Sequence, residues 1–280
     1  MLILVYLVLM LNISAFGVSG TNLLASRRYC GYQHSDDYVR KNSSISIDEF
    51  PWIAQILYDR YRNIECTGSL INNRYVLTAA HCLILPSRNA TAVRLGDYDV
   101  TRSTDCVTIS DIGEECSDPV EEFDIEEKIT HRYFSREYGP NDIGLVRLSR
   151  SVVYSEYIRP ICLPLSDNSG IENYEDVAVS GWGLLSRLRE PTNLKKKILA
   201  KLTPNQKCKE MYMNFRRPVT QFHICATDDS ETYTCVGDFG GPLMISIKNQ
   251  WEQIGLLTFA KECGSGFPSV YLNIAKYLKW

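Results

Sequence analysis

The stretch CVGDFGGPL, residues 235–243, is a glycine-rich turn of the kind that presents one side chain to a cleft. Its consecutive glycines let backbone N–H groups converge on an anion, as in an oxyanion hole. The presented side chain is Phe239, and a benzyl group can neither be deprotonated nor attack a carbonyl. The turn is therefore either an active-site loop or such a loop after its chemistry was lost.

Two further motifs occur elsewhere in the chain. LTAAHC (77–82) places His81 just after an apolar strand, and NDIGLVRL (141–148) places Asp142 at the mouth of another. A lone histidine in that setting is more often packed or solvated than a base, and the aspartate is more often a turn or cap residue. Each motif alone is weak evidence for a catalytic site. Their occurrence together, in the order His, Asp and then GDFGGP and with these flanks, is in contrast a highly specific pattern.

Short apolar or alternating runs recur along the chain, separated by turn residues. This spacing predicts an all-β sandwich or barrel rather than βαβ units. Residues 273–280 carry Ile274, Tyr277 and Leu278 at helical spacing and predict a short closing helix. The turn-rich residues 101–122 predict a long, stapled surface loop. The apolar runs are WIAQIL (52–57), GSLINNRYVLTAA (68–80), AVRLG (92–96), DIGLVRL (142–148), DVAVSGWG (176–183), LMISI (243–247) and EQIGLLTF (252–259).

The first twenty residues are an apolar run that ends in small residues, which predicts a secretory signal cleaved before Thr21. The competing membrane anchor is disfavoured because the unbroken apolar part stops at Asn12. All ten cysteines follow this segment, and their even number predicts disulfides in an oxidising, extracellular compartment. Sequons at Asn42 and Asn89 are candidate glycosylation sites. A net charge of −3 favours neither nucleic acid nor a generally acidic or basic partner.

On these motifs the chain resembles the chymotrypsin- and trypsin-like serine proteases. The resemblance implies two packed six-stranded antiparallel β-barrels with a cleft between them. The loop around residues 105–131 further resembles that of the arthropod clip-domain branch, although too few residues and no cysteines precede Cys30 to form a clip domain. The matching stretches are EFPW (49–52), TGSLINNRYVLTAAHC (67–82), NDIGLVRL (141–148), RPICLP (159–164), SGWG (180–183), CVGDFGGPL (235–243) and FPSVYL (267–272).

After the predicted signal peptide (1–20), the resemblance implies an N-terminal segment tethered through Cys30 (21–48) and a non-catalytic protease domain (49–280). It also implies how the cysteines pair. The first of these pairs would hold the N-terminal segment to the body of the fold. The implied pairs are Cys30–Cys162, Cys66–Cys82, Cys106–Cys116, Cys208–Cys225 and Cys235–Cys263.

The resemblance implies a role for each motif. His81 matches the family's base and Asp142 its orienter, but Phe239 replaces the nucleophilic serine in the oxyanion loop of Gly237, Asp238 and Phe239. Loss of the nucleophile costs on the order of a million-fold in a well-studied serine protease. Peptide hydrolysis by the usual route is therefore excluded, and His81 and Asp142 are vestigial. Restoring serine at 239 alone is not expected to restore hydrolysis.

The activation site departs from the family as well. Active members are cut after a basic residue to free an Ile- or Val-led N-terminus, whose α-amine pairs with the residue matching Asp238. Here the stretch is YVRKN (38–42), with Tyr38 at the basic position. Cleavage at Arg40 or Lys41 would free Lys or Asn, both poor fits for an apolar slot. We therefore expect Asp238 to lack an obvious cationic partner.

The specificity pocket that the resemblance implies consists of Tyr233, Thr258, Ala260 and Gly266. Tyr233 stands at its base, where a trypsin-like enzyme would hold Asp for an Arg or Lys side chain. A methyl group at Ala260 narrows the wall along which substrate would pass. We therefore expect a filled or shallow pocket.

Two charged segments are candidates for binding. Residues 105–127 hold ten acids and no Lys or Arg, and with Asp97 and Asp99 they are candidate calcium ligands; the alternative is a solvated negative surface. Residues 187–217 hold ten basic residues and two acids, with Lys195–Lys197 at their centre. Such a segment would attract a polyanion or an acidic partner, or would simply be a wet surface.

The favoured function is a secreted, non-catalytic protease homologue that modulates an extracellular cascade of the melanisation, prophenoloxidase or clotting type. It would bind cascade proteases, their zymogens or prophenoloxidase as a cofactor or decoy. The missing clip domain favours a decoy or modulator, including a venom component. One alternative is an active trypsin-like endopeptidase, if Phe239 is an error. Another is a polyanion- or surface-binding recognition protein. No nucleic acid and no membrane span are expected, and calcium is the one candidate cofactor.

Overall fold

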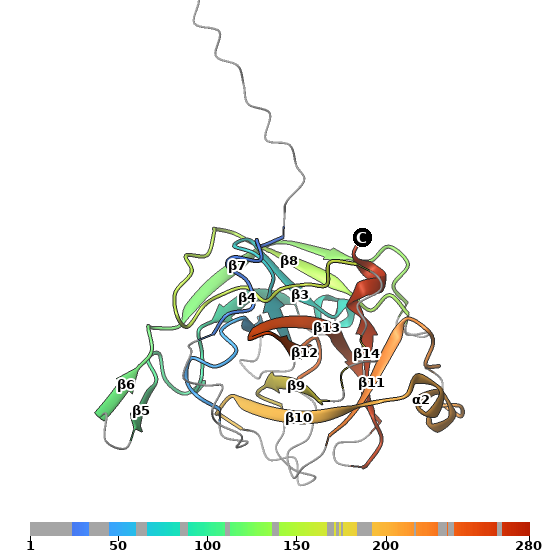
Figure 1. Ribbon diagram of the computed structural model, residues 1–280. Coiled ribbons are helices and arrows are strands. Elements are labelled where there is room, and N and C mark those ends of the chain that lie inside the picture. Colours follow the sequence, from blue (N-terminus) through green and yellow to red (C-terminus); the bar gives the residue numbers. More distant parts are fainter. Residues whose placement is uncertain are drawn as a thin grey trace, which may run out of the picture.

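The computed structural model describes residues 24–33, 45–59, 66–84, 89–109, 113–135, 140–166, 171, 174, 176–183, 192–215, 217–228, 234, 238–261 and 265–280. Over these ranges the chain forms two closed barrels of six antiparallel strands each. Figure 1 shows the two barrels packed against each other, with the C-terminus at the edge of the first. The predicted all-β class and two-barrel architecture are confirmed.

The first barrel closes in the order β1-β2-β3-β8-β7-β4. Along β8, Val146 and Leu148 are buried while Leu145 and Arg147 are half-buried. This period of two is that of a strand with one face toward a core. The strands are β1 (Ile53–Tyr58), β2 (Thr67–Leu70), β3 (Tyr75–Thr78), β4 (Ala90–Leu95), β7 (Glu121–Thr130) and β8 (Gly144–Leu148).

The second barrel closes in the order β10-β11-β14-β13-β12-β9. Its strand β12 uses both faces: Leu243 packs into this barrel's core, and Met244 into the cluster shared with the first barrel. The two-residue turn between β12 and β13 has positive φ at Lys248 and Asn249, as a tight hairpin requires. The strands are β9 (Asp176–Gly181), β10 (Lys196–Thr203), β11 (His223–Asp228), β12 (Pro242–Ile247), β13 (Gln250–Phe259) and β14 (Ser269–Asn273).

The remaining elements lie outside the barrels. The stretch expected to be a stapled loop forms a hairpin of β5 (Cys106–Ile109) and β6 (Gly113–Cys116), which projects from the body in Figure 1. Two short helices are α1 (Ala80–Leu83) and α2 (Asn205–Met211). The expected closing helix is a single 3-10 turn, η3 (Ile274–Tyr277). In the described part of the chain, no helix is long and apolar enough to cross a membrane.

Disulfides join several of these elements. Cys30–Cys162 ties the segment 24–33 to the barrels, and Gly31 adds backbone hydrogen bonds to Pro160 and Trp251 on either side of it. The fifth implied pair, Cys235–Cys263, lies outside the described residues, as do residues 1–20 and Asn42. The structure contains Cys30–Cys162, Cys66–Cys82, Cys106–Cys116 and Cys208–Cys225, which are four of the five implied pairs.

Candidate functional site

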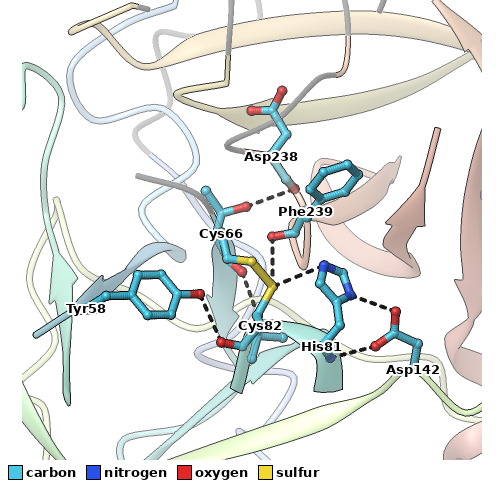
Figure 2. Close-up of a disulfide and its surroundings, with 9 residues drawn as sticks. Tyr58, Cys66, His81, Cys82, Asp142, Asp238 and Phe239 are labelled. Atoms are coloured by element: carbon cyan, nitrogen blue, oxygen red, sulfur yellow. Dashed lines mark hydrogen bonds and ion pairs between the residues drawn. A yellow bond between two sulfur atoms is a disulfide. The ribbon is translucent and has the colours of Figure 1, made fainter. Parts of the chain in front are cut away.

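His81 and Asp142 lie together where the two barrels meet (Figure 2). His81 is in α1, directly after β3, and Asp142 precedes β8. The His81 backbone N–H donates to Asp142 Oδ1 at 2.8 Å, and the ring Nδ1 lies 2.7 Å from Asp142 Oδ2. The side chain of Asp142 is 2% exposed and that of His81 is 18% exposed. The carboxylate therefore holds the histidine by both backbone and ring, and leaves Nε2 directed away from it.

Phe239 occupies the space in front of this pair. Its ring meets the His81 ring edge to face, with the centroids 5.6 Å apart. The side chain is half-buried and packs against the core clusters of both barrels. The His81 Nε2 has the disulfide sulfur of Cys82 at 3.7 Å. An aromatic ring, and not a hydroxyl, thus stands beside the imidazole.

The backbone of the loop from Asp238 to Gly241 is held from both barrels. Thr67 of β2 donates its N–H to the Phe239 carbonyl at 2.8 Å and its hydroxyl to the Asp238 carbonyl at 3.0 Å. Gly240 donates to the Leu257 carbonyl at 2.9 Å. Gly240 has a φ of +80°, and a Cβ there would lie 2.9 Å from the Ala79 nitrogen, so only glycine fits. Gly237, the first residue of the predicted oxyanion loop, lies outside the described residues.

Asp238 has a cationic partner, and the expectation that it would lack one is wrong. Its carboxylate is fully buried and points away from His81 in Figure 2. Oδ2 lies 2.7 Å from the Nζ of Lys196, and Oδ1 accepts the Gly183 N–H at 2.8 Å. Lys196 opens β10 and pairs with Gly181 of β9. The pairing of these two strands brings the lysine to Asp238, which linear spacing does not reveal.

The expectation that Lys195–Lys197 form a surface for polyanions is also wrong. The three residues are only 5%, 6% and 8% exposed. Lys197 pairs with Glu49 at 2.5 Å, in the segment that leads into β1. Burial lowers the pKa of Lys195 to about 8, although the carboxylates of Asp48, Glu49, Asp97 and Asp105 oppose the shift. These ammonium groups neutralise acids inside the protein and are not free to bind an external anion.

Three of the four residues of the expected specificity pocket lie in or between β13 and β14. Thr258 is buried and donates its hydroxyl to the Val270 carbonyl at 3.0 Å. Ala260 follows β13 and is half-buried, and Gly266 is exposed with a φ of +78°. Tyr233 lies outside the described residues, so a filled or shallow pocket stays a prediction.

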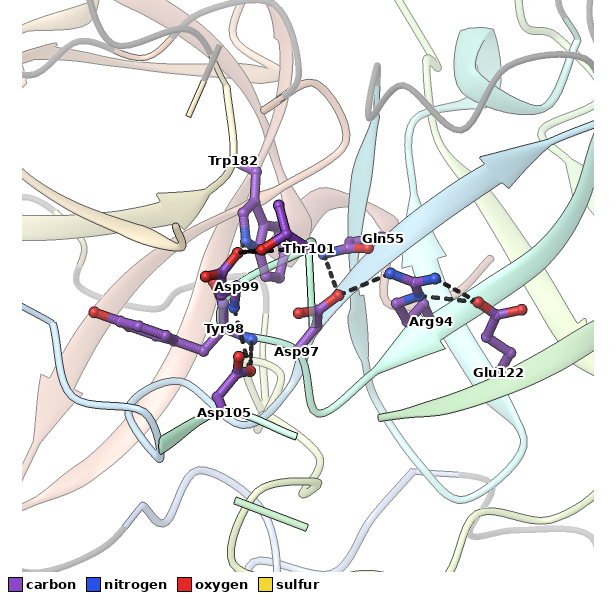
Figure 3. Close-up of polar contacts among 9 residues, drawn as sticks. All are labelled: Gln55, Arg94, Asp97, Tyr98, Asp99, Thr101, Asp105, Glu122 and Trp182. Carbon is purple, nitrogen blue, oxygen red and sulfur yellow. Dashed lines mark hydrogen bonds and ion pairs between the residues drawn. The ribbon is translucent and has the colours of Figure 1, made fainter. Parts of the chain in front are cut away.

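The acids proposed as calcium ligands do not converge (Figure 3). Asp97 accepts from Gln55 at 3.1 Å and pairs with Arg94 at 3.2 Å. Asp99 instead accepts from the backbone and hydroxyl of Thr101. One oxygen each of Asp97 and Asp105 is buried without a hydrogen bond, but both carboxylates favour the charged form of the buried Lys195. The protein supplies its own cation here, and the arrangement does not fit a calcium site built on Asp97 and Asp99.

Elsewhere, the glutamates of β7 pair with arginines, as in the Glu122–Arg94 and Glu121–Arg150 pairs. Over the described ranges, two groups of three residues have metal-ligand spacing, and each includes a disulfide-bonded cysteine pair. Asn89 is exposed just before β4 and accepts a hydrogen bond from Lys128. Its glycosylation stays a prediction.

Lys196, the Lys197–Glu49 pair and the contact of Phe239 with His81 were not anticipated from sequence. The sequence does contain a pattern that indicates burial of Lys196. Three consecutive lysines directly precede residues 198–202, of which all but Lys201 are apolar, in a chain whose Asp238 needs a cation. A charged run that leads straight into a strand is a candidate for burial with internal partners.

Known proteins resemble the chain in sequence and in structure. A family model described as Trypsin matches residues 39–280. Serine protease 7 of Drosophila melanogaster is 37% identical over 271 residues, which is 92% of this chain and 68% of that protein. Melanization protease 1 of the same species is 36% identical over 278 residues, 94% of this chain and 69% of that protein. The solved structure of the Drosophila Grass clip serine protease of the Toll pathway matches with a TM-score of 0.78 at 27% identity, covering 90% of this chain and 73% of that one.

Proposed function

The chain belongs to the trypsin family, and from that premise we propose that it is a secreted, non-catalytic member that modulates an extracellular proteolytic cascade by binding other proteins. One observation carries the proposal. The side chain that faces His81 in the loop is the benzyl ring of Phe239, 5.6 Å from the imidazole.

Acyl transfer in this site would need an oxygen or sulfur nucleophile at residue 239. His81 and Asp142 are paired as a base and its orienter, but the base has no hydroxyl to deprotonate. A water molecule acting in its place would have to occupy space that the Phe239 ring fills. The pair therefore orders the cleft and does not perform chemistry.

A role in a cascade is supported by the relatives. One is named a melanization protease, and the matching solved structure is a protease of the Toll pathway. A chain that keeps the surface of a protease but lacks a nucleophile can bind a protein that such a protease would recognise. It would then leave that protein uncut. The partners proposed are cascade proteases, their zymogens or prophenoloxidase.

Labelling with a fluorophosphonate probe tests the absence of catalysis. The purified chain is expected to stay unlabelled under conditions that label trypsin fully, because the probe reacts with an activated serine. Phe239→Ala is the matched control, and it should be equally unlabelled. Covalent labelling of the natural chain would overturn the proposal and favour the active endopeptidase, and peptide mass spectrometry of residue 239 would then be decisive.

A reconstituted melanisation cascade tests the modulating role and its sign. Purified chain is added to the activating protease and prophenoloxidase, and the time to phenoloxidase activity is recorded. A delay identifies a decoy, and an acceleration identifies a cofactor. An unchanged time course at a molar excess of the chain, in this cascade and in a clotting cascade, would contradict the proposal.

A further inference from the structure

Asp238 and Lys196 form an ion pair that is closed off from solvent. The side chain of Asp238 is 0% exposed and that of Lys196 is 5% exposed, with Oδ2 and Nζ 2.7 Å apart. A carboxylate that is buried without a cation is strongly disfavoured in its charged form and tends to take up a proton. The conformation of the loop at Asp238 therefore depends on the lysine.

The end of β9 and the residues just after it close around this pair. Lys196 stands opposite Gly181 in the β9–β10 ladder, and Gly183 donates its N–H to the Asp238 carboxylate at 2.8 Å. A side chain at either glycine would collide with that carboxylate. The space between these glycines and the Asp238 carboxylate therefore admits no side chain at residues 181 and 183. The close packing fixes the position of the carboxylate.

The same pair sets the loop at the cleft. The Asp238 carbonyl accepts from the Thr67 hydroxyl at 3.0 Å and from the Gly241 N–H at 2.9 Å. The next residue, Phe239, is the one that faces His81. Fixing the carboxylate on one side thus fixes the backbone that presents Phe239 on the other.

We propose that Lys196 is a positioning residue, a permanent internal cation that sets the loop from Asp238 to Gly241 in the uncut chain. No new chain terminus is needed to pair with Asp238, since a side chain of β10 already does so. The cleft surface available to a protein partner is then fully formed as soon as the chain is folded. This inference concerns loop order and stands whether or not the chain modulates a cascade.

Hydrogen exchange of peptides that contain residues 238–243 tests the proposal in the full, uncut chain. Lys196→Gln is expected to speed exchange of this loop roughly tenfold or more, because the carboxylate loses its cation. The matched control is Lys201→Gln, at an exposed position of the same strand, which should leave the loop unchanged. Equal exchange in the natural chain and in Lys196→Gln would overturn the proposal.

Cleavage provides the second arm. The natural chain is cut by limited proteolysis after Arg40 or Lys41, with the cut confirmed by mass, and exchange of the loop should not change. A loop that gains protection only after the cut would overturn the proposal, since the new terminus would then be the cation that matters.

The third arm needs no destabilising variant. Brief acetylation of the folded natural chain, read by mass spectrometry, should leave the Lys196 amine at least about tenfold less modified than that of Lys201, because the former is buried in an ion pair. Comparable modification of the two amines would contradict the pairing. This result tests the ion pair on which the proposal depends even if Lys196→Gln fails to fold.

Discussion

Phe239 and Lys196 affect the same loop in different ways: the first concerns its chemistry and the second its conformation. Phe239 removes the oxygen on which acyl transfer depends and fills the space in front of His81. Lys196 keeps the backbone of the loop in place through Asp238. Together they support the proposed non-catalytic role, in which the loop keeps its shape and serves as a recognition surface.

The variant Phe239→Ser tests the retained pair of His81 and Asp142 separately from the expected specificity pocket. The new hydroxyl would lie beside a histidine that Asp142 still holds at 2.7 Å, so we expect slow fluorophosphonate labelling of the variant. Peptides with Arg or Lys at the cleavage site should stay uncut, because the resemblance implies that Tyr233 takes the position at which a trypsin-like enzyme needs an acid. Phe239→Ser combined with Asp142→Asn should lose the labelling. Failure of the folded single variant to label would show that the retained pair can no longer activate a serine.

Strands β10 and β11 carry charged or polar side chains into the interior. The lysines at the start of β10 reach Asp238 and Glu49, which joins the second barrel to the segment that leads into the first. His223 opens β11 and is buried, with Nδ1 accepting the Thr220 N–H at 3.0 Å. Its Nε2 has no hydrogen-bond partner within the described structure. Burial accordingly lowers the pKa of His223 to about 4.

This histidine predicts how stability depends on pH. Between pH 6.5 and 4 the unfolded chain binds a proton at residue 223 that the folded chain excludes, so the free energy of unfolding falls as the pH falls. The loss is at most about 3 kcal/mol, from a difference of roughly 2.5 pKa units. Urea unfolding of the natural chain and of His223→Gln at pH 7 and pH 4.5 measures it. The variant should lose less stability than the natural chain over this range, and equal losses would refute the assignment.

The whole molecule is two barrels joined by a shared core and by the N-terminal segment. Residues of both barrels, such as Ile56 and Leu256, belong to one buried cluster. The segment 24–33 lies against this body through Cys30–Cys162, with a further ion pair between Arg27 and Glu252. The early segment is thus bound to parts of the chain that are distant in sequence, including β13 of the second barrel, and not only to its neighbours.

Removing this disulfide should destabilise the molecule more than removing a local one. Cys30→Ser with Cys162→Ser opens a link across 132 residues, and Cys106→Ser with Cys116→Ser opens one across 10 residues. In the chain-entropy description the first costs about 4 to 5 kcal/mol and the second about 2 to 3 kcal/mol. Urea unfolding without reductant compares the two variants. A larger loss for the shorter link would show that strain or local packing outweighs chain entropy.

Much of the fold followed from the sequence alone. Apolar runs of strand length, separated by turns, gave the all-β class, because a strand with one buried face repeats every two residues. The proposal that the chain lacks the family's nucleophile depends on the resemblance and on the identity of residue 239, since no fold gives a benzyl group a lone pair.

The tertiary structure decided where the charges go. Lys195–Lys197 belong to a basic run by sequence but are buried in the fold, and Asp238 has a cation that lies far from it along the chain. The acids near Asp97 are likewise neutralised by groups of the protein itself. The physical reason is that an ion pair depends on distance and burial, which strand register and barrel closure set. Composition records how many charges a chain has, and only the folded chain selects which of them face one another.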